Sequence, residues 1–266
     1  MSAPPDILAD IVRRRRQRLG VGSVAGPPGQ SRAAWDEPLP SSHPLLAALA
    51  DRAPAIIAEV KMGSPRIGSL ADRIDPEAQA RCYRDGGAAA LSVVVEPDFF
   101  GGSYELLARL KAASALPAIA KDFVVSASQI DDARTAGADA VLLVAALYSA
   151  NDLRAWTAYA RSRGLVPLIE THDADDRSKL DGREWELVGV NNRDLHTFEV
   201  SLERSIAALP ALPPAAVKVS ESGIRTGADV ARLAAAGFDA FLIGESLLLA
   251  DDPAAKLAEL IAATLP

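Results

Sequence analysis

Short apolar runs rich in β-branched residues alternate with helical segments from about residue 43 to the C-terminus. A polar loop follows each run, and several of the helical segments end in glycine. Eight runs have the length of buried strands: residues 55–60, 88–95, 117–121, 138–144, 166–170, 186–191, 216–220 and 240–243. Their C-terminal ends follow one another at intervals of about 20 to 36 residues, the size of a strand with its crossover helix. The pattern therefore predicts parallel strands joined by helices.

Local signals support the helical segments and point to a repeated unit. Asp75 precedes Pro76, which places an N-cap residue before a proline at the first helical position. The sequences at 136–140 and 236–240 are near-copies, each joining a helix end to a strand. Eight similar units predict an α/β protein with a single closed (β/α)8 TIM barrel, a fold that commonly takes roughly 250 residues. A doubly wound open sheet is the alternative.

The N-terminal part has a different pattern from the repeating body. Residues 1 to about 19 have the periodicity of an amphipathic helix, and residues 20–42 are rich in Gly, Pro and Ser. We interpret the run Arg13 to Arg16 as the solvated face of this helix instead of a nucleic-acid or targeting patch. The expected organisation is therefore a helix and linker over residues 1–42, covering the barrel mouth, and a barrel over residues 43–266.

Composition narrows the class of protein. The 266 residues carry 28 Lys and Arg against 35 Asp and Glu, a formal charge of −7, so a basic nucleic-acid-binding surface is not expected. Cys82 is the only cysteine, which excludes an intramolecular disulfide and fits a reducing cytoplasm. The longest uncharged apolar run, Ala140 to Ala150, is shorter than the roughly 20 residues that span a bilayer. We expect a cytoplasmic protein that binds neither nucleic acid nor a membrane.

Ionisable side chains stand at the ends of most predicted strands. In a (β/α)8 barrel the C-terminal strand ends form one concave face, so these groups are expected to converge there. A Lys or Glu at a single strand end is often only the first solvated loop residue, and the coincidence across strands carries the inference. A mixed set of this kind suits proton transfer, with lysine as acid and glutamate as base. The candidate residues are Glu59, Lys61, Lys121, Glu170, Asn191 and Glu221.

The loops after the last two strands contain small residues. Ser222-Gly223 follows the seventh strand and Gly244-Glu245 follows the eighth, the usual place for a phosphate to rest on backbone N–H groups in such barrels. These glycines could simply permit tight turns, but their presence in both loops favours phosphate binding. The substrate is therefore expected to be a phosphate ester.

Motifs for other chemistries are absent from the sequence. There is no Gly-x-Gly-x-x-Gly fingerprint after a strand, no P-loop and no Gly-x-Ser-x-Gly elbow. His43, His172 and His196 show no paired spacing for a metal, and we interpret each as a loop residue, although His172 could reach the rim. No metal or other cofactor is expected.

Six motifs follow one another along the chain, and a further segment follows the second strand. The motifs are Ile57 to Lys61 with Ser64-Pro65, Leu116 to Phe123, Pro167 to Glu170, Gly189 to Leu195, Val219 to Ile224 and Phe241 to Leu247, and the further segment is Phe99 to Ser103. Together they resemble the indole-3-glycerol-phosphate synthase family over nearly the whole chain.

The resemblance implies a cofactor-free reaction of 1-(2-carboxyphenylamino)-1-deoxyribulose 5-phosphate in tryptophan biosynthesis, by ring closure, decarboxylation and dehydration. It implies that Lys121 is the general acid and Glu170 the general base of the dehydration. Lys61 would contact the anthranilate carboxylate or act as a second acid. Glu59, Asn191 and Glu221 would orient Lys61 and the substrate hydroxyls. The other implied contacts are Ser64, Phe100, Phe123 and Arg193 for the substrate and Ser222, Gly223, Gly244 and Glu245 for the phosphate.

The sequence departs from the family pattern at Met62, Gly63, Arg66 and Val95, in segments expected to line the anthranilate end. A specialised relative with a substituted substrate is therefore one alternative. A non-catalytic phosphometabolite binder and a barrel that isomerises aminosugar phosphates are two others. A non-catalytic binder does not explain the clustered charges. An aminosugar-phosphate isomerase leaves Lys121 with Glu170 unexplained. We expect a monomer whose partner is a phosphorylated small molecule.

Overall fold

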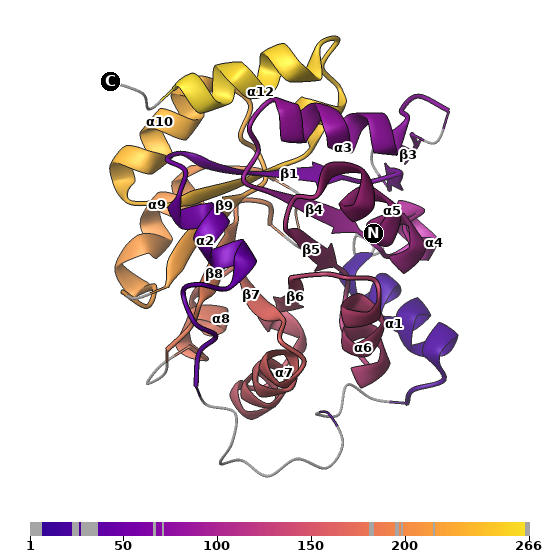
Figure 1. Ribbon diagram of the computed structural model, residues 1–266. Helices are drawn as coiled ribbons and strands as arrows, with labels where there is room; N and C mark the ends of the chain where they lie inside the picture. Colours follow the sequence, from indigo (N-terminus) through magenta and orange to yellow (C-terminus); the bar gives the residue numbers. More distant parts are fainter. Residues whose placement is uncertain are drawn as a thin grey trace, which may run out of the picture.

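The computed structural model describes residues 7–22, 27, 37–65, 68–70, 72–180, 184–194, 197, 199–214 and 216–263. Eight parallel strands close into one barrel in chain order, with the last strand pairing with the first through Ala55 and Ala240 (Figure 1). The barrel strands are β1 (Ala55–Val60), β4 (Ala90–Val94), β5 (Ala118–Lys121), β6 (Ala140–Val144), β7 (Val166–Thr171), β8 (Leu187–Asn191), β9 (Val217–Glu221) and β10 (Ala240–Ile243). This closure confirms the predicted (β/α)8 fold and excludes the open sheet.

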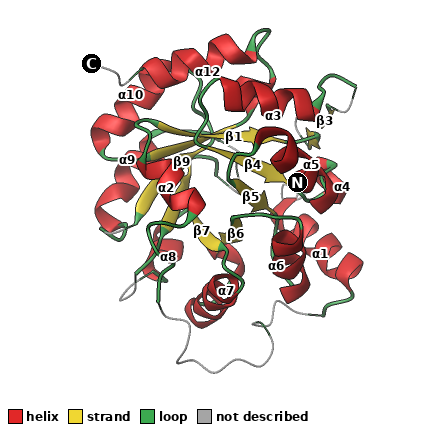
Figure 2. Cartoon of the chain, viewed as in Figure 1, coloured by secondary structure: helices red, strands yellow, loops and turns green. Residues whose placement is uncertain are grey.

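Helices surround the barrel on the outside, as Figure 2 shows by the ring of helices around the central strands. The helices are α1 (Ile7–Leu19), α2 (Pro44–Ala50), α3 (Pro76–Asp85), α4 (Pro97–Phe100), α5 (Tyr104–Ser114), α6 (Ala127–Thr135), α7 (Ala150–Ser162), α8 (Ala174–Ser178), α9 (Glu203–Ala208), α10 (Gly227–Ala236), α11 (Glu245–Leu248) and α12 (Pro253–Ala262). Two 3₁₀ turns, η1 (Ala145–Leu147) and η2 (Leu209–Ala211), and a small ribbon of β2 (Gly63–Ser64) with β3 (Gly68–Ser69) complete the described elements. The predicted cap of α3 is present, because Asp75 accepts a hydrogen bond from the Ala78 N–H at 3.0 Å. None of the helices in the described ranges is long and apolar enough to cross a bilayer.

The core has two parts, because alternate residues of each strand point to opposite faces of the barrel wall. Outward side chains such as Ile56 and Val93 pack against the helices, and inward ones such as Ile57 and Leu168 fill the barrel. Leu45 and Leu49 of α2 belong to the inner cluster, beside Ala55 where β1 begins. Helix α2 therefore closes the N-terminal end of the barrel.

The inward positions become ionisable at the C-terminal end of four strands. The residues two positions before them are buried and apolar, so each charged side chain continues the inward-facing row by one layer. The pairs are Ile57 with Glu59, Ile119 with Lys121, Leu168 with Glu170, and Val219 with Glu221. The strand alternation itself thus directs these four groups to one place.

Helix α1 lies beside α4, with α6 nearby, at the side of the barrel where the strands end (Figure 1). The expectation that the Arg13 to Arg16 run is a solvated face is wrong for Arg15, which is 4% exposed. Its guanidinium forms a buried two-pronged ion pair with Asp122, just after β5, in which Nε lies 3.0 Å from Oδ1. Arg13 is exposed, as expected. One side of the run therefore attaches the helix to the barrel.

Candidate active site

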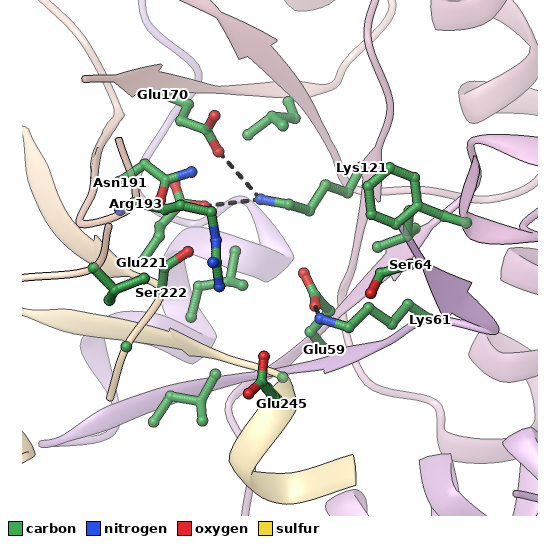
Figure 3. A pocket seen from close by; sticks show the side chains of 18 of the residues that line it. Glu59, Lys61, Ser64, Lys121, Glu170, Asn191, Arg193, Glu221, Ser222 and Glu245 are labelled. Carbon is green, nitrogen blue, oxygen red and sulfur yellow. Dashed lines mark hydrogen bonds and ion pairs between the residues drawn. The ribbon is translucent and has the colours of Figure 1, made fainter. Parts of the chain in front are cut away.

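A cavity of about 940 Å³ lies at the C-terminal end of the strands. Figure 3 shows side chains from several strands pointing into it. All fourteen site residues expected from the sequence line this cavity: Glu59, Lys61, Ser64, Phe100, Lys121, Phe123, Glu170, Asn191, Arg193, Glu221, Ser222, Gly223, Gly244 and Glu245. The structure thus brings together residues that are up to 186 positions apart, from Glu59 to Glu245.

Lys121 is the centre of the charged group. Its Nζ lies 2.9 Å from Oε2 of Glu221 and 3.2 Å from Oε2 of Glu170 (Figure 3). Burial lowers the pKa of Lys121, but the carboxylates of Glu221, Glu170 and Glu59 more than offset this and raise the pKa above its ordinary value. Lys121 is therefore a charged ammonium at neutral pH.

The two carboxyl groups that share Lys121 differ in acidity. Burial raises the pKa of Glu221 to about 7, although the Lys121 ammonium opposes this. Burial also raises the pKa of Glu170, but Lys121 and His172 more than offset this and hold the pKa below its usual range. Two coupled carboxyls whose pKa values are driven apart provide an ionised group and a protonatable group at the same pH.

A second ion pair lies in the same cavity on β1 and the loop after it. Nζ of Lys61 is 2.7 Å from Oε1 of Glu59. Burial raises the pKa of Glu59, but Lys61 and Lys121 more than offset this and lower it. A Cβ at Gly244 would lie 2.4 Å from Oε1 of Glu59, so only glycine leaves room for this carboxylate.

Gly189 has the same role for Glu221, since a Cβ there would lie 2.2 Å from Oε1 of that carboxylate. This Oε1 has no hydrogen-bond partner among the described residues. Asn191, at the end of the same strand as Gly189, accepts a hydrogen bond from the Arg193 N–H at 3.0 Å and so fixes the start of the next loop. Figure 3 shows the Arg193 side chain pointing into the cavity on the side of Glu221 and Ser222.

The loop after β9 makes a tight turn at the cavity wall. Ser222 has φ +67° and Gly223 has φ +82°, so two successive residues adopt the left-handed region that non-glycine residues rarely occupy. A Cβ at Gly223 would lie 2.3 Å from Cγ1 of Val200, which shows how closely the loop after β8 covers this turn. Gly244, Glu245 and the start of α11 line the cavity next to it. The loops expected to hold phosphate are therefore adjacent.

An apolar wall lines the cavity near the end of β4. Phe100 and Phe123 have ring centroids 6.4 Å apart in a tilted arrangement. Helix α1 contributes lining residues that the sequence interpretation did not predict, namely Ile7, Leu8 and Ile11. Their apolar spacing was visible in the sequence, but nothing there identified the surface on which they pack.

The Asp122 carboxylate that anchors α1 is highly buried and fully engaged. Besides Arg15, it accepts hydrogen bonds from the Tyr104 hydroxyl at 3.1 Å and from Nε2 of Gln129 at 2.8 Å. Asp122 directly follows Lys121 in the chain, so the anchor of α1 and the central lysine share one short segment.

The structure places two of the residues singled out in the sequence behind the cavity surface. Val95 itself does not line the cavity, because it is 1% exposed and packs in the outer core cluster, whereas its neighbour Val94 faces the cavity. The reason is the strand alternation, which turns successive residues to opposite faces. His172 lies in the loop between β7 and α8, as expected, but it is buried at 7% exposure and lies against Glu170.

The other departures from the family pattern are less informative about the cavity. Met62 and Gly63 are not among the residues that line the cavity. A Cβ at position 63 would lie 2.9 Å from the Gly68 carbonyl oxygen, so glycine is needed there for the β2–β3 ribbon. Arg66, Leu195 and His196 lie outside the described residues. Ser64 and Pro65 represent this loop in the cavity.

Comparisons with known proteins agree with the sequence motifs. The family model described as indole-3-glycerol phosphate synthase matches residues 8–260. An indole-3-glycerol phosphate synthase of Albidiferax ferrireducens is 40% identical over 261 residues, which cover 97% of this chain and 98% of that protein. One of Burkholderia vietnamiensis is 44% identical over 207 residues, covering 78% of this chain and 79% of that protein.

Solved structures with low identity share the barrel. A thiamine phosphate pyrophosphorylase from Pyrococcus furiosus gives a TM-score of 0.59 at 14% identity, covering 79% of this chain and 95% of its own. A 3-hexulose-6-phosphate synthase from Salmonella typhimurium gives 0.62 at 15% identity, covering 79% of this chain and 97% of its own. At this identity the likeness shows the fold alone.

Proposed function

The chain belongs to the indole-3-glycerol phosphate synthase family of enzymes, and on this premise we propose that it is a carboxy-lyase acting on 1-(2-carboxyphenylamino)-1-deoxyribulose 5-phosphate. The ring carbon that carries the carboxylate forms a bond to the ribulose carbonyl carbon. The carboxylate then leaves as carbon dioxide and its bonding electrons return to the ring system. Loss of the former carbonyl oxygen as water gives indole-3-glycerol phosphate, an intermediate of tryptophan biosynthesis.

Lys121 is the proposed general acid of the ring closure. The carbonyl oxygen becomes an alkoxide as the new carbon–carbon bond forms, and a nearby ammonium stabilises this charge and supplies the proton. Because the pKa of Lys121 is raised, the group keeps its proton until such a strongly basic oxygen is present. Lys121 must exchange one carboxylate for the substrate oxygen, and its two partners hold it at the cavity wall before this happens.

Glu170 and Glu221 are proposed to act after the ring closes. Glu170 is ionised at neutral pH and can take the proton whose removal accompanies loss of water. Glu221, with a pKa of about 7 and an unpartnered Oε1 among the described residues, can bind a substrate hydroxyl as donor or acceptor. Lys61, paired with Glu59, places positive charge for the anthranilate carboxylate.

The two ends of the cavity orient the substrate. The phosphate is proposed to bind at the adjacent loops of Ser222-Gly223 and Gly244-Glu245, while the aromatic ring lies against Phe100, Phe123 and the apolar side chains of α1. This places the reacting carbonyl between them, where Lys121 is found. We also propose that one chain carries out the reaction without a cofactor, because the acid, the base and the phosphate loops that the proposed steps need all line this one cavity.

The observation that carries the proposal is the Lys121 ammonium bridging Glu170 and Glu221 in a cavity with an apolar wall at one side. The test is incubation of the purified chain with the carboxyphenylamino-deoxyribulose phosphate, following indole fluorescence and released carbon dioxide in parallel. We expect both products in equal amounts with a kcat in the common range of about 1 to 10³ per second. Binding of the substrate without either product would refute the proposal and favour a non-catalytic binder.

A further inference from the structure

His172 is a buried ionisable group next to the proposed site that has no role in the proposed mechanism. It follows β7 two residues after Glu170, and its side chain is 6% exposed. Its Nε2 lies 3.2 Å from Oε1 of Glu170, and its Nδ1 lies 3.4 Å from Oδ2 of Asp176 on α8. His172 is not among the cavity-lining residues, so it stands behind Glu170 as seen from the cavity.

We propose that His172 is a positioning residue of this reaction, whose imidazolium holds Oε1 of Glu170 so that Oε2 is presented to Lys121 and to the substrate. The inference rests on the proposed function, because it assigns a task in that reaction. It adds to that function a second layer of groups that controls the proposed base.

Both ring nitrogens of His172 face carboxylates, and this determines its charge. A neutral imidazole carries one N–H and one bare nitrogen, so one of its nitrogens would then point a lone pair at a carboxylate. An imidazolium carries a proton on each nitrogen and suits both partners. Neither ring nitrogen has hydrogen-bond geometry among the described residues, so the two contacts are ion pairs only when the ring is protonated. Hydrogen bonds at catalytic sites are often poorly aligned without substrate and tighten when it binds.

The groups around His172 form a chain of alternating charge from the protein surface to the cavity. Lys179 Nζ lies 3.1 Å from Oδ1 of Asp176, and Oδ2 of Asp176 also accepts a hydrogen bond from the His172 backbone N–H at 3.0 Å. Glu170 then links His172 to Lys121. Each carboxylate in this chain therefore lies between two cations when His172 is protonated.

The remaining charged neighbours do not change this pattern. Asp173, at the N-cap of α8, accepts a hydrogen bond from the Asp176 N–H at 2.9 Å. Asp175 is exposed and pairs with Lys179 at 3.3 Å, and Glu221 is held by Lys121. Burial lowers the pKa of His172, but Asp176 and Glu170 more than offset this and raise it to about 9. The imidazolium is thus the resting form at neutral pH.

The arrangement has a consequence during turnover. When Lys121 turns to the substrate oxygen, Oε2 of Glu170 loses its cation and becomes free to accept a proton. His172 keeps Oε1 in place and leaves one positive charge beside the carboxylate. Glu170 therefore becomes more basic at the step that needs a base, without leaving its position.

The first test compares His172→Gln with His43→Gln. His43 caps α2 at the closed end of the barrel, so it is a matched substitution away from the cavity. A positioned base contributes about 10²- to 10⁴-fold, so partial loss of alignment is expected to lower kcat about 10- to 100-fold with KM within about threefold. His43→Gln is expected to keep kcat within about twofold.

The pH profile separates positioning from a purely structural role. In the wild type, kcat is expected to fall as pH rises through about 9, where the imidazolium loses its proton. Lys121 does not account for this alkaline limb of the pH profile, since the pKa of Lys121 lies above its ordinary value. The alkaline limb should vanish in His172→Gln. A slow His172→Gln enzyme that retains an unchanged limb would overturn the proposal, as would one with wild-type kcat.

Two further measurements test the proposal even if His172→Gln does not fold. Asp176→Asn keeps the side-chain size and an acceptor oxygen, and it should move the limb to lower pH, whereas the control Asp175→Asn on the same helix should not. An NMR titration of the wild-type imidazole should give a pKa near 9, and a value at or below 6.5 would refute the imidazolium. A wild type that yields no indole would instead refute the proposed function, and the positioning role with it.

Discussion

Replacement of Lys121 by methionine removes the ammonium that both carboxyls share while keeping a side chain of similar length. The proposed general acid is lost, and Glu170 and Glu221 then face each other without the cation that lies 3.2 Å and 2.9 Å from them. Loss of a positioned acid costs about 10²- to 10⁴-fold in kcat, or about 2.7 to 5.4 kcal/mol of transition-state stabilisation. We expect kcat to fall within this range.

The fold should survive the change at neutral pH. Removing one partner of a buried ion pair costs about 3 to 5 kcal/mol when the other partner stays charged. Glu221 avoids this cost by taking up a proton, because its pKa is already about 7 and protonation at pH 7 therefore costs under about 1 kcal/mol. The Lys121→Met protein should consequently be more stable relative to wild type at pH 6 than at pH 8.

The assay is indole fluorescence under steady-state conditions at pH 7, with substrate affinity measured by titration and melting curves at pH 6 and 8. Substrate affinity should stay within about tenfold, since the phosphate loops are untouched. Lys111→Met is the control, because Lys111 pairs with Asp139 outside the cavity and its loss should leave kcat within about twofold. A Lys121→Met enzyme that retains more than about a tenth of wild-type kcat would refute the assigned role.

Three further outcomes follow from the same structure. Glu170→Gln should release carbon dioxide faster than it forms indole, so a decarboxylated, undehydrated intermediate should accumulate in quenched samples; equal decline of both products would contradict the assigned step. Arg15→Met should lower kcat and make α1 sensitive to trypsin, because Asp122 loses its ion-pair partner on α1. The control is Arg13→Met at an exposed position, and equal cleavage of the two variants would show that Arg15 does not anchor α1. The pKa of His172 rises from 6.5 to about 9 on folding, so the stability that protonated His172 contributes is complete below pH 6.5 and is lost as pH rises through 9. The unfolding free energy measured in urea should fall by up to about 3 kcal/mol over this window. An unfolding free energy that does not change with pH would contradict this contribution.

The barrel was predictable because its strands are short apolar runs at regular spacing. Residues 55–60 and 240–243 were predicted with the observed bounds, and the other strands differ by one or two residues at one or both ends. Errors are small because a polar loop follows each apolar run and limits the strand. The charged cluster was predictable for a related reason, since it occupies the last inward position of alternate strands, β1, β5, β7 and β9.

Contacts between segments without such a register were not predictable. The sequence showed that α1 is amphipathic, but Arg15 belongs to a run of four arginines, and only the buried Asp122 distinguishes it from its neighbours. His172 had no metal-type spacing, and its partner Asp176 becomes visible only when α8 folds back on the end of β7. The sequence placed Val95 in a segment expected to line the cavity, but it did not show which of Val94 and Val95 faces inward, because successive side chains of a strand point to opposite faces.

The charged layer at the top of the barrel is not explained by stability. Buried ion pairs of this kind can often be replaced by apolar residues with no loss of stability, and the layers directly below are already apolar. The layer instead leaves three different protonation behaviours side by side at neutral pH: a lysine that is charged, a glutamate that is ionised and a glutamate with a pKa of about 7. Gly189 and Gly244 preserve the space for two of the carboxylates. A site that only binds a phosphate ester needs positive charge and N–H groups, not a buried base beside a buried acid, and the arrangement therefore favours catalysis.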